Sequence, residues 1–369
     1  MLIFLFISAC FLAYSNGAND NFKGVATLFG SGTTDYKKAI NWATITTLSG
    51  SVAAIFLAGE LVKNFSGKGL VPDELIATPI FAISIAFGAA LTVFIATKVG
   101  MPISTTHGLV GALFGAGVMA VGSQFNFEKL GNVFLIPLIV SPLMAAVLSF
   151  VAYLTFRFLR KKSGITKSSC ICVYEKQIAT QVVNSNVTLE MTSSLEVATC
   201  KNNCVQSYKG RILGISSQQI IDRLHFLSAG IVSFARGLND TPKIVGLLLI
   251  ISVISVQWSM VIIALVMALG GLFNAKKVGE TMSKKITPMN SGQGFTANLV
   301  TGLLVTTASV HGLPVSTTHV SVGSIFGIGT VTKKADYKMI GKIVLSWVLT
   351  LPVAAILSAI IFKICQSLI

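Results

Sequence analysis

Long runs without a single charged residue limit the fold of this chain more than any other feature. Asp, Glu, Lys and Arg are absent from residues 99–127, 130–156, 244–275 and 286–332. About 20 apolar residues are enough for a helix to cross a bilayer. Only 11% of all residues are charged, whereas soluble domains carry about 25%. The sequence therefore predicts an all-α, polytopic protein of the cell membrane, with the lipid bilayer as its first partner.

The distribution of basic residues predicts how the chain lies in that membrane. The net charge is +15, which in a soluble protein would suggest a nucleic-acid partner. Here we expect no nucleic acid, because Lys and Arg gather on the cytoplasmic side of membrane proteins. Residues 157–223 hold ten basic and four acidic residues, which predicts a cytoplasmic segment. No basic residue precedes the first apolar run, so we expect residues 1–14 to be a retained membrane segment with the N-terminus outside.

Four of the six cysteines lie in this central segment, at Cys170, Cys172, Cys200 and Cys204. Four thiols could hold a metal ion, but these spacings are atypical of such sites. Reduced thiols in the cytoplasm are the favoured interpretation, and we expect no cofactor.

One hexapeptide pattern occurs twice, as Pro102–His107 and Pro314–His319. Across 16 aligned positions from each proline, 10 residues are identical, so the chain contains an internal repeat. Proline suits the first turn of a helix, and free N–H groups beside hydroxyls can bind an oxyanion. The alternative is a capped helix that packs through glycines. The hydroxyl triads, as we call them, are Ser104, Thr105 and Thr106, and Ser316, Thr317 and Thr318.

A second pattern, Gly-x-Asn-Asp-x-x-Lys, also occurs twice, beginning at Gly17 and at Gly237. Asn and Asp favour helix starts over helix interiors, so we expect each pattern to interrupt an apolar helix. In the second copy, Thr241-Pro242 predicts the start of the new half-helix. These repeats predict three parts: a first transmembrane repeat (1–160), a linker or insert (161–220) and a second transmembrane repeat (221–369).

Duplicated membrane halves with interrupted helices are typical of secondary transporters, whose sites lie between the repeats near the midplane. The triad-bearing elements could be re-entrant hairpins or full crossings, and the sequence leaves that choice open. The chain has no phosphate-binding loop pattern for ATP hydrolysis and no nucleophile with a positioned base. We therefore expect a transporter driven by an ion gradient and no enzyme.

The carboxylates within the apolar segments are the first candidates for function, because charges there are costly. Asp20 and Asp240, with Asn19 and Asn239, offer the oxygen ligands of a hard cation such as Na⁺. The alternative is that each aspartate only caps its own half-helix. The triads supply donors to an anion, and cations would offset the cost of burying it.

Two further pairs of residues are secondary candidates. Lys23 and Lys243 follow their aspartates by three residues, and we expect pairing with the aspartate rather than contact with the anion. For His107 and His319, a hydrogen bond that fixes the turn is favoured over proton relay. Arg236 aligns with Asn16 and is a weaker candidate.

Together these motifs resemble the inorganic phosphate transporter (PiT) family of cation-coupled phosphate symporters. The resemblance covers both halves and excludes the central segment; its motifs begin at Gly17, Pro102, Gly237 and Leu313. It implies inverted-topology repeats, both termini outside, a cytoplasmic central loop, phosphate uptake with Na⁺ or H⁺, and dimers. It also implies that the Asn-Asp pairs and the triads line the site. Animal members carry Glu where this chain has Thr47 and Asn298, which favours Na⁺ bound by neutral oxygens and Asp.

The expected function is the symport of inorganic phosphate with Na⁺. Phosphate keeps a hydroxyl that can donate to an aspartate, whereas sulfate does not, so an aspartate beside the anion favours phosphate. The alternatives are a proton-coupled phosphate or sulfate symporter and an anion channel.

Overall fold

The computed structural model describes residues 1–168, 172–181, 189–198, 207–209, 211–212, 215–251, 254–284 and 286–368. These residues form two compact units. Residues 1–157 and 221–369 make one unit, and residues 158–220 make the other. The segments predicted as two repeats therefore pack together as one body.

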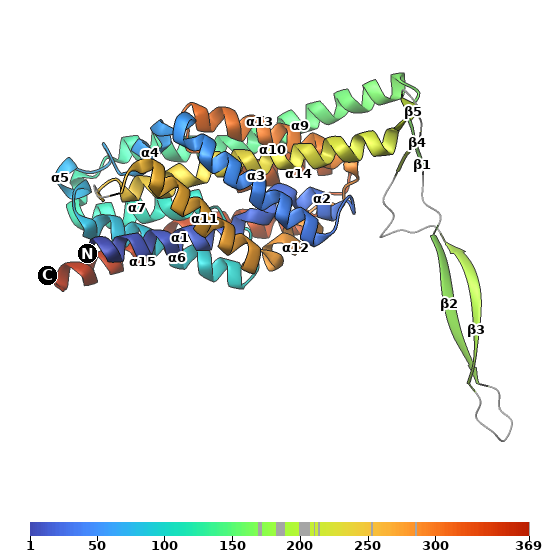
Figure 1. Cartoon of the computed structure of the whole chain (residues 1–369), viewed down its shortest axis with the longest axis horizontal. Coiled ribbons are helices and arrows are strands. Elements are labelled where there is room, and N and C mark those ends of the chain that lie inside the picture. Colours follow the sequence, from blue (N-terminus) through green and yellow to red (C-terminus); the bar gives the residue numbers. More distant parts are fainter. Residues whose placement is uncertain are drawn as a thin grey trace. The chain divides into compact units, whose positions relative to one another are not determined.

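Helices make up the larger unit (Figure 1). Before the central segment they are α1 (Leu2–Asp20), η1 (Asn21–Val25), α2 (Ala26–Gly30), α3 (Tyr36–Leu57), α4 (Gly59–Phe65), α5 (Asp73–Ile76), α6 (Pro79–Lys98), α7 (Thr105–Val121), η2 (Gly122–Gln124), α8 (Phe127–Lys129), η3 (Leu130–Leu135) and α9 (Ile136–Lys162). After it they are α10 (Ser217–Val245), η4 (Gly246–Leu248), α11 (Val256–Asn274), α12 (Lys276–Lys284), α13 (Ser291–Val310), α14 (Thr317–Thr332) and α15 (Tyr337–Ser367). Seven helical segments of the described chain are long and apolar enough to cross a membrane.

The smaller unit contains short antiparallel strand pairs, which the sequence did not predict. β1 (Thr166–Ser168) pairs with β4 (Ser207–Lys209), β2 (Cys172–Gln181) with β3 (Leu189–Ala198), and β5 (Arg211–Ile212) with β6 (Ile215–Ser216). Three of the four central cysteines, Cys170, Cys200 and Cys204, lie outside the described residues, so the possible metal site does too.

The order of helices recurs in the two halves of the larger unit. The series α1, α3, α4, α6, α7, α9 is repeated by α10, α11, α12, α13, α14, α15. Within each series the Asn-Asp pattern lies in the first helix, and the triad lies where the fifth helix begins. Helices α6 and α7 contact each other, as do α13 and α14, so each triad follows the turn of a helical hairpin.

Glycines bring helices of opposite halves into close contact at the Asn-Asp segments. A β-carbon on Gly17 of α1 would lie 1.9 Å from the carbonyl oxygen of Met267 in α11. At the matching place, a β-carbon on Gly237 of α10 would lie 2.1 Å from the carbonyl oxygen of Thr47 in α3. Only glycine permits such an approach, so the first helix of each half packs on the second helix of the other half.

The helices that carry the triads also pack on helices of the opposite half. A β-carbon on Gly115 of α7 would lie 2.0 Å from the carbonyl oxygen of Ala355 in α15. A β-carbon on Gly327 of α14 would lie 2.2 Å from that of Ala146 in α9. The fifth helix of each half thus packs on the last helix of the other, and the two halves interlock.

The two Asn-Asp segments differ in how they interrupt their helices. The α-helix α1 ends at Asp20, and the chain continues as the 3-10 turn η1, as predicted. The predicted helix start at Thr241-Pro242 is wrong, because α10 runs through Pro242 to Val245 before the 3-10 turn η4. Proline removes one helical hydrogen bond, but close packing of Gly237 and Gly246 against the first half holds this helix on both sides of Pro242.

The two chain ends lie at the same end of the helical unit (Figure 1). The C-terminal part of α9 and the N-terminal part of α10 lie at the opposite end of that unit.

Candidate functional site

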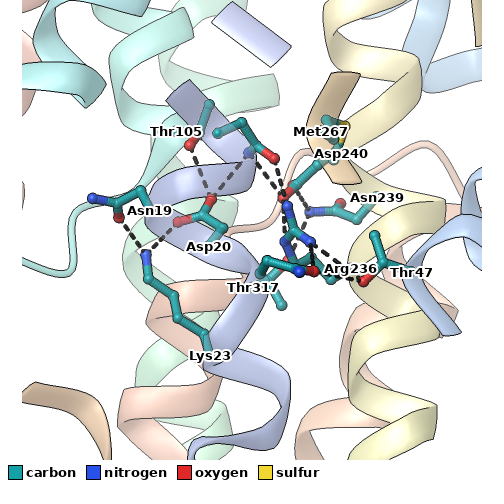
Figure 2. A network of polar contacts seen from close by, with 12 residues as sticks. Asn19, Asp20, Lys23, Thr47, Thr105, Arg236, Asn239, Asp240, Met267 and Thr317 are labelled. Atoms are coloured by element: carbon teal, nitrogen blue, oxygen red, sulfur yellow. Dashed lines mark hydrogen bonds and ion pairs between the residues drawn. The ribbon is translucent and has the colours of Figure 1, made fainter. Parts of the chain in front are cut away.

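Five buried charged side chains mark the centre of the larger unit. Among the described residues, the Asp, Glu, Lys and Arg side chains that are buried are Asp20, Lys23, Arg236, Asp240 and Lys243, each at most 4% exposed. They come from the Asn-Asp segments of both halves. The Asn16 amide nitrogen donates to Asp20 Oδ2 at 3.0 Å and to Asp240 Oδ2 at 3.2 Å. One amide thus joins the two carboxylates, and the predicted residues of both halves meet in one network (Figure 2).

Asp20 is held by the first triad and by Lys23. Thr105 Oγ1 donates to Asp20 Oδ2 at 2.9 Å, and Lys23 Nζ donates to Asp20 Oδ1. The ion pair expected from the three-residue spacing therefore forms. Asn19 Oδ1 (2.8 Å), Thr318 Oγ1 (2.8 Å) and the carbonyl oxygen of Ile103 (2.7 Å) also lie within hydrogen-bond distance of Lys23 Nζ, whose three N–H donors are shared among these oxygens and Asp20. Oxygens from both halves surround this ammonium group.

Asp240 has more positive charge around it and looser contacts. Asn239 Nδ2 donates to Asp240 Oδ1 at 3.0 Å. Arg236 Nε and Lys243 Nζ each lie 3.7 Å from an Asp240 oxygen. Lys243 Nζ donates instead to Thr106 Oγ1 and to the Val315 carbonyl oxygen, both at 2.7 Å. Lys243 thus bridges the halves as Lys23 does, but lies farther from its aspartate.

The serine of each triad caps a helix. Ser104 Oγ accepts a hydrogen bond from the His107 N–H at 3.1 Å, and Ser316 Oγ accepts one from the His319 N–H at 3.3 Å. Each serine is therefore an N-cap, as in the capping alternative. The first intrahelical bond of α7 runs from Gly108 N to Ser104 O. The N–H groups before it have no carbonyl partner four residues earlier in the helix, and that of His107 is satisfied by Ser104 Oγ.

The last threonine of each triad connects the two halves. Thr106 Oγ1 donates to the carbonyl oxygen of Val315 at 3.3 Å, and Thr318 Oγ1 donates to that of Ile103 at 3.1 Å. Thr317 Oγ1 accepts from Asn239 Nδ2 at 3.2 Å. The two helix starts therefore lie against each other, each within reach of a lysine from the other half.

The two predicted histidines pack at the same junction. The rings of His107 and His319 meet edge to face, with centroids 4.4 Å apart. His319 also stacks on Trp347 of α15 at 3.8 Å, and its Nδ1 lies 3.2 Å from the carbonyl oxygen of Leu138. These contacts tie α7, α14 and α15 together beside the triads.

Sequence reasoning missed several members of the network. Asn16, the shared donor, stood out in the sequence only as the counterpart of Arg236. Thr97 Oγ1 accepts from Asn19 Nδ2 at 2.9 Å, and Ser309 Oγ donates to Asn239 Oδ1 at 3.2 Å. The sequence did contain a signal for Thr97 and Ser309, because each lies five positions before the proline that precedes its triad.

This arrangement of groups suits two kinds of ligand. Ammonium groups, hydroxyls and the starts of α7 and α14 suit an oxyanion. Carboxylate and amide oxygens suit a hard cation. The ammonium, carboxylate and amide side chains are buried and hydrogen-bonded within the protein, which is the condition under which polar groups are tolerated away from water.

Comparison with known proteins identifies the family. Residues 16–358 match the model described as "Phosphate transporter family". The chain is 28% identical to a Pyrococcus abyssi protein named "Putative phosphate permease", over 98% of this chain and 97% of that protein. It is 30% identical to a Helicobacter pylori protein of the same name, over 89% of this chain and 68% of that protein.

A solved structure named "The sodium-dependent phosphate transporter" shares the fold. It superposes with a TM-score of 0.77 at 23% identity, covering 100% of this chain and 99% of the solved one. The resemblance stated from the motifs is thus confirmed, as are the multi-pass membrane location and the expectation of a transporter and no enzyme. With its family model matched over most of its length, this chain belongs to the phosphate transporter family.

Proposed function

We propose that this chain is a secondary active symporter that imports inorganic phosphate with sodium. The observation that carries the proposal is the meeting of both Asn-Asp segments and both hydroxyl triads around the Asn16 amide. The family match supports phosphate as the substrate. The similarity to a solved transporter that is named as sodium-dependent supports sodium as the coupling ion.

Phosphate would bind between the starts of α7 and α14. Its oxygens would accept hydrogen bonds from the triad hydroxyls and from the first N–H groups of both helices. Lys23 and Lys243 now donate to the carbonyl oxygens of Ile103 and Val315, at the same helix starts. A phosphate oxygen is a stronger acceptor for these donors than a carbonyl oxygen, because it carries charge.

Sodium would bind at the Asn-Asp pairs, with oxygens of Asn19, Asp20, Asn239 and Asp240 as ligands. Burial of an anion of charge two without compensating cations is prohibitively costly. Cations and phosphate therefore favour each other's binding in one buried site, which is the physical basis of coupled transport.

The orientation and assembly are part of the proposal. We expect inverted-topology repeats, with the termini outside and the central segment in the cytoplasm. The basic excess of residues 157–223 supports this orientation, as do the chain ends lying together at one end of the helical unit (Figure 1). A homodimer is expected from the family resemblance alone.

Uptake of labelled phosphate into proteoliposomes, with sodium and pH gradients imposed separately, tests the function. A sodium gradient should drive accumulation above the outside concentration, which an anion channel cannot do. Uptake driven only by a pH gradient would indicate proton coupling, and strong competition by unlabelled sulfate would indicate a different substrate.

Asp20→Asn and Asp240→Asn should each abolish sodium-driven uptake, because each removes a carboxylate that faces buried cations. Asp73→Asn is the matched control, since Asp73 is exposed at the start of α5. Uptake at the wild-type rate in both site variants would refute the proposed role of the aspartates.

A further inference from the structure

The two halves differ at one buried position of the site. Asn16 and Arg236 occupy the same place in the repeated pattern, directly before Gly17 and Gly237. Both side chains are fully buried. The second half therefore carries one positive charge for which the first half has no counterpart.

The guanidinium group of Arg236 lies among oxygens of the first half (Figure 2). Its terminal nitrogens donate to Asn16 Oδ1 at 2.7 Å, Asn21 Oδ1 at 3.0 Å and Thr47 Oγ1 at 3.3 Å. Its Nε lies 3.7 Å from Asp240 Oδ2 and has no hydrogen-bond partner among the described residues. A carboxylate, two amide oxygens and a hydroxyl would also suit a hard cation.

The matching position in the first half, around Asn16, has different neighbouring residues. Gly17 packs on the backbone of Met267 where Gly237 packs on the backbone of Thr47, so the counterpart of Thr47 is a methionine, which has no hydroxyl. The counterpart of Asn21 is Thr241, whose hydroxyl donates to Ser51 Oγ at 2.7 Å. The oxygens gathered around Arg236 are thus specific to one side of the site.

The buried charges can be counted. Counted by formal charge, Lys23, Arg236 and Lys243 oppose Asp20 and Asp240, so the buried residues of the described site carry a formal net charge of plus one. One sodium ion and one phosphate of charge minus two would make the loaded site neutral. Without Arg236, two sodium ions would be needed for the same balance. A buried site strongly favours the neutral combination, because uncompensated charge is costly away from water.

From this asymmetry we infer that Arg236 is a tethered counter-ion that replaces one coupling sodium, so that one sodium accompanies each phosphate dianion. The inference rests on the proposed function and deepens it. Of the two Asn-Asp pairs proposed above as sodium ligands, the pair at Asp20 then holds the mobile sodium, and Arg236 takes the place of the ion at Asp240. Asp20 has one buried cation within ion-pair distance. Asp240 has two such neighbours, Arg236 and Lys243, and both repel a further cation.

The wild-type protein in proteoliposomes supplies the first test. Uptake of labelled sodium and labelled phosphate is measured in parallel at about pH 8, where phosphate is mainly the dianion. We expect about one sodium per phosphate, and a sodium dependence with a Hill coefficient of about 1. A ratio of two or more overturns the inference but leaves sodium-coupled transport standing. No sodium-stimulated phosphate uptake at all overturns the proposed function, and the inference with it.

Arg236→Asn supplies the second test, because it gives the second half the residue of the first. The ratio should rise to about two sodium ions per phosphate, with a Hill coefficient approaching 2. Arg236→Lys is the control, since it keeps the charge and should keep the ratio near one. If the ratio of sodium to phosphate transported by Arg236→Asn equals that of wild type, the inference is contradicted. If that variant does not fold, the wild-type ratio and the lysine control decide the matter.

Discussion

At the scale of single residues, the three hydroxyl residues of each triad have different tasks. Ser104 caps α7, Thr106 links α7 to the turn before α14, and Thr105 donates to Asp20. A sequence motif treats these residues as one unit, whereas the structure separates a stabilising residue from one that touches a buried carboxylate. Substitutions within one triad should therefore have different effects.

Thr105→Val removes the hydroxyl that contacts Asp20 and preserves the shape of the side chain. A hydrogen bond to a charged group is worth about 2 kcal/mol, so phosphate uptake should fall roughly thirtyfold. The variant is compared with wild type by initial uptake rates in proteoliposomes. Thr155→Val is a suitable control, because the exposed Thr155 only donates to Val151 O within α9. An equal loss of uptake in both variants would contradict a specific role for Thr105.

The sequence predicted most residues of the site, but it did not predict which of them contact one another. The paired motifs predicted the Asn-Asp pairs, the triads and the lysines, because charged and hydroxyl residues stand out in apolar segments. Nothing in the sequence indicates that Asn16 joins Asp20 to Asp240, since the residues at positions 16 and 240 meet only through the packing of α1, α3, α10 and α11. The contacts of Arg236 remained hidden for the same reason.

At the scale of helices, local sequence signals predicted one interruption correctly and misplaced the other. Asp20 ends α1, which agrees with the preference of Asn and Asp for helix ends. The proline signal at Pro242 did not start a new helix, because tertiary packing around α10 outweighed the local preference. Two glycines after each triad do pack closely on helices of the opposite half, namely Gly111 and Gly115 on α15 and Gly323 and Gly327 on α9.

Gly115→Ala tests whether these glycine contacts hold the halves together. The new methyl group would lie 2.0 Å from the carbonyl oxygen of Ala355, so α7 and α15 would have to separate. We expect a destabilisation of about 1–3 kcal/mol, measured as a lower melting temperature in detergent, together with reduced phosphate uptake.

Gly341→Ala provides the control on α15, because a β-carbon there would have no neighbour within 4 Å. Alanine is the better helix former, so this variant should be at least as stable as wild type. If both alanine variants lower the melting temperature equally, the close approach of α7 and α15 does not explain the effect.

At the scale of the whole molecule, neither half contains a complete site. Lys23 and Asp20 come from the first half and contact Thr318 and, through Asn16, Asp240 of the second. Each broken or triad-bearing helix also buries its glycine face against the other half. Stability and the proposed binding of phosphate and sodium therefore depend on the same association between halves.

Residues 1–160 and 221–369, expressed together as separate chains, should assemble into an active carrier. Their contacts within the helical unit are extensive and do not depend on covalent connection at the central segment. Phosphate uptake into cells that express both fragments is the measurement, and each fragment alone should give none. A chain divided instead at Gly100, in the turn before the first triad, should be inactive. Activity of a single half would contradict the shared site.

The packing of helices on the opposite half also has a consequence for how the internal repeat of this chain could have arisen. A forerunner with one copy of the repeat would have exposed the glycine faces of its first and fifth helices unless a second, identical chain covered them. Such a forerunner would have had to be an obligate pair of equal subunits, with the same residue at the positions now held by Asn16 and Arg236. Joining two copies in one chain would allow them to diverge, so that a charge such as that of Arg236 could be carried on one side alone.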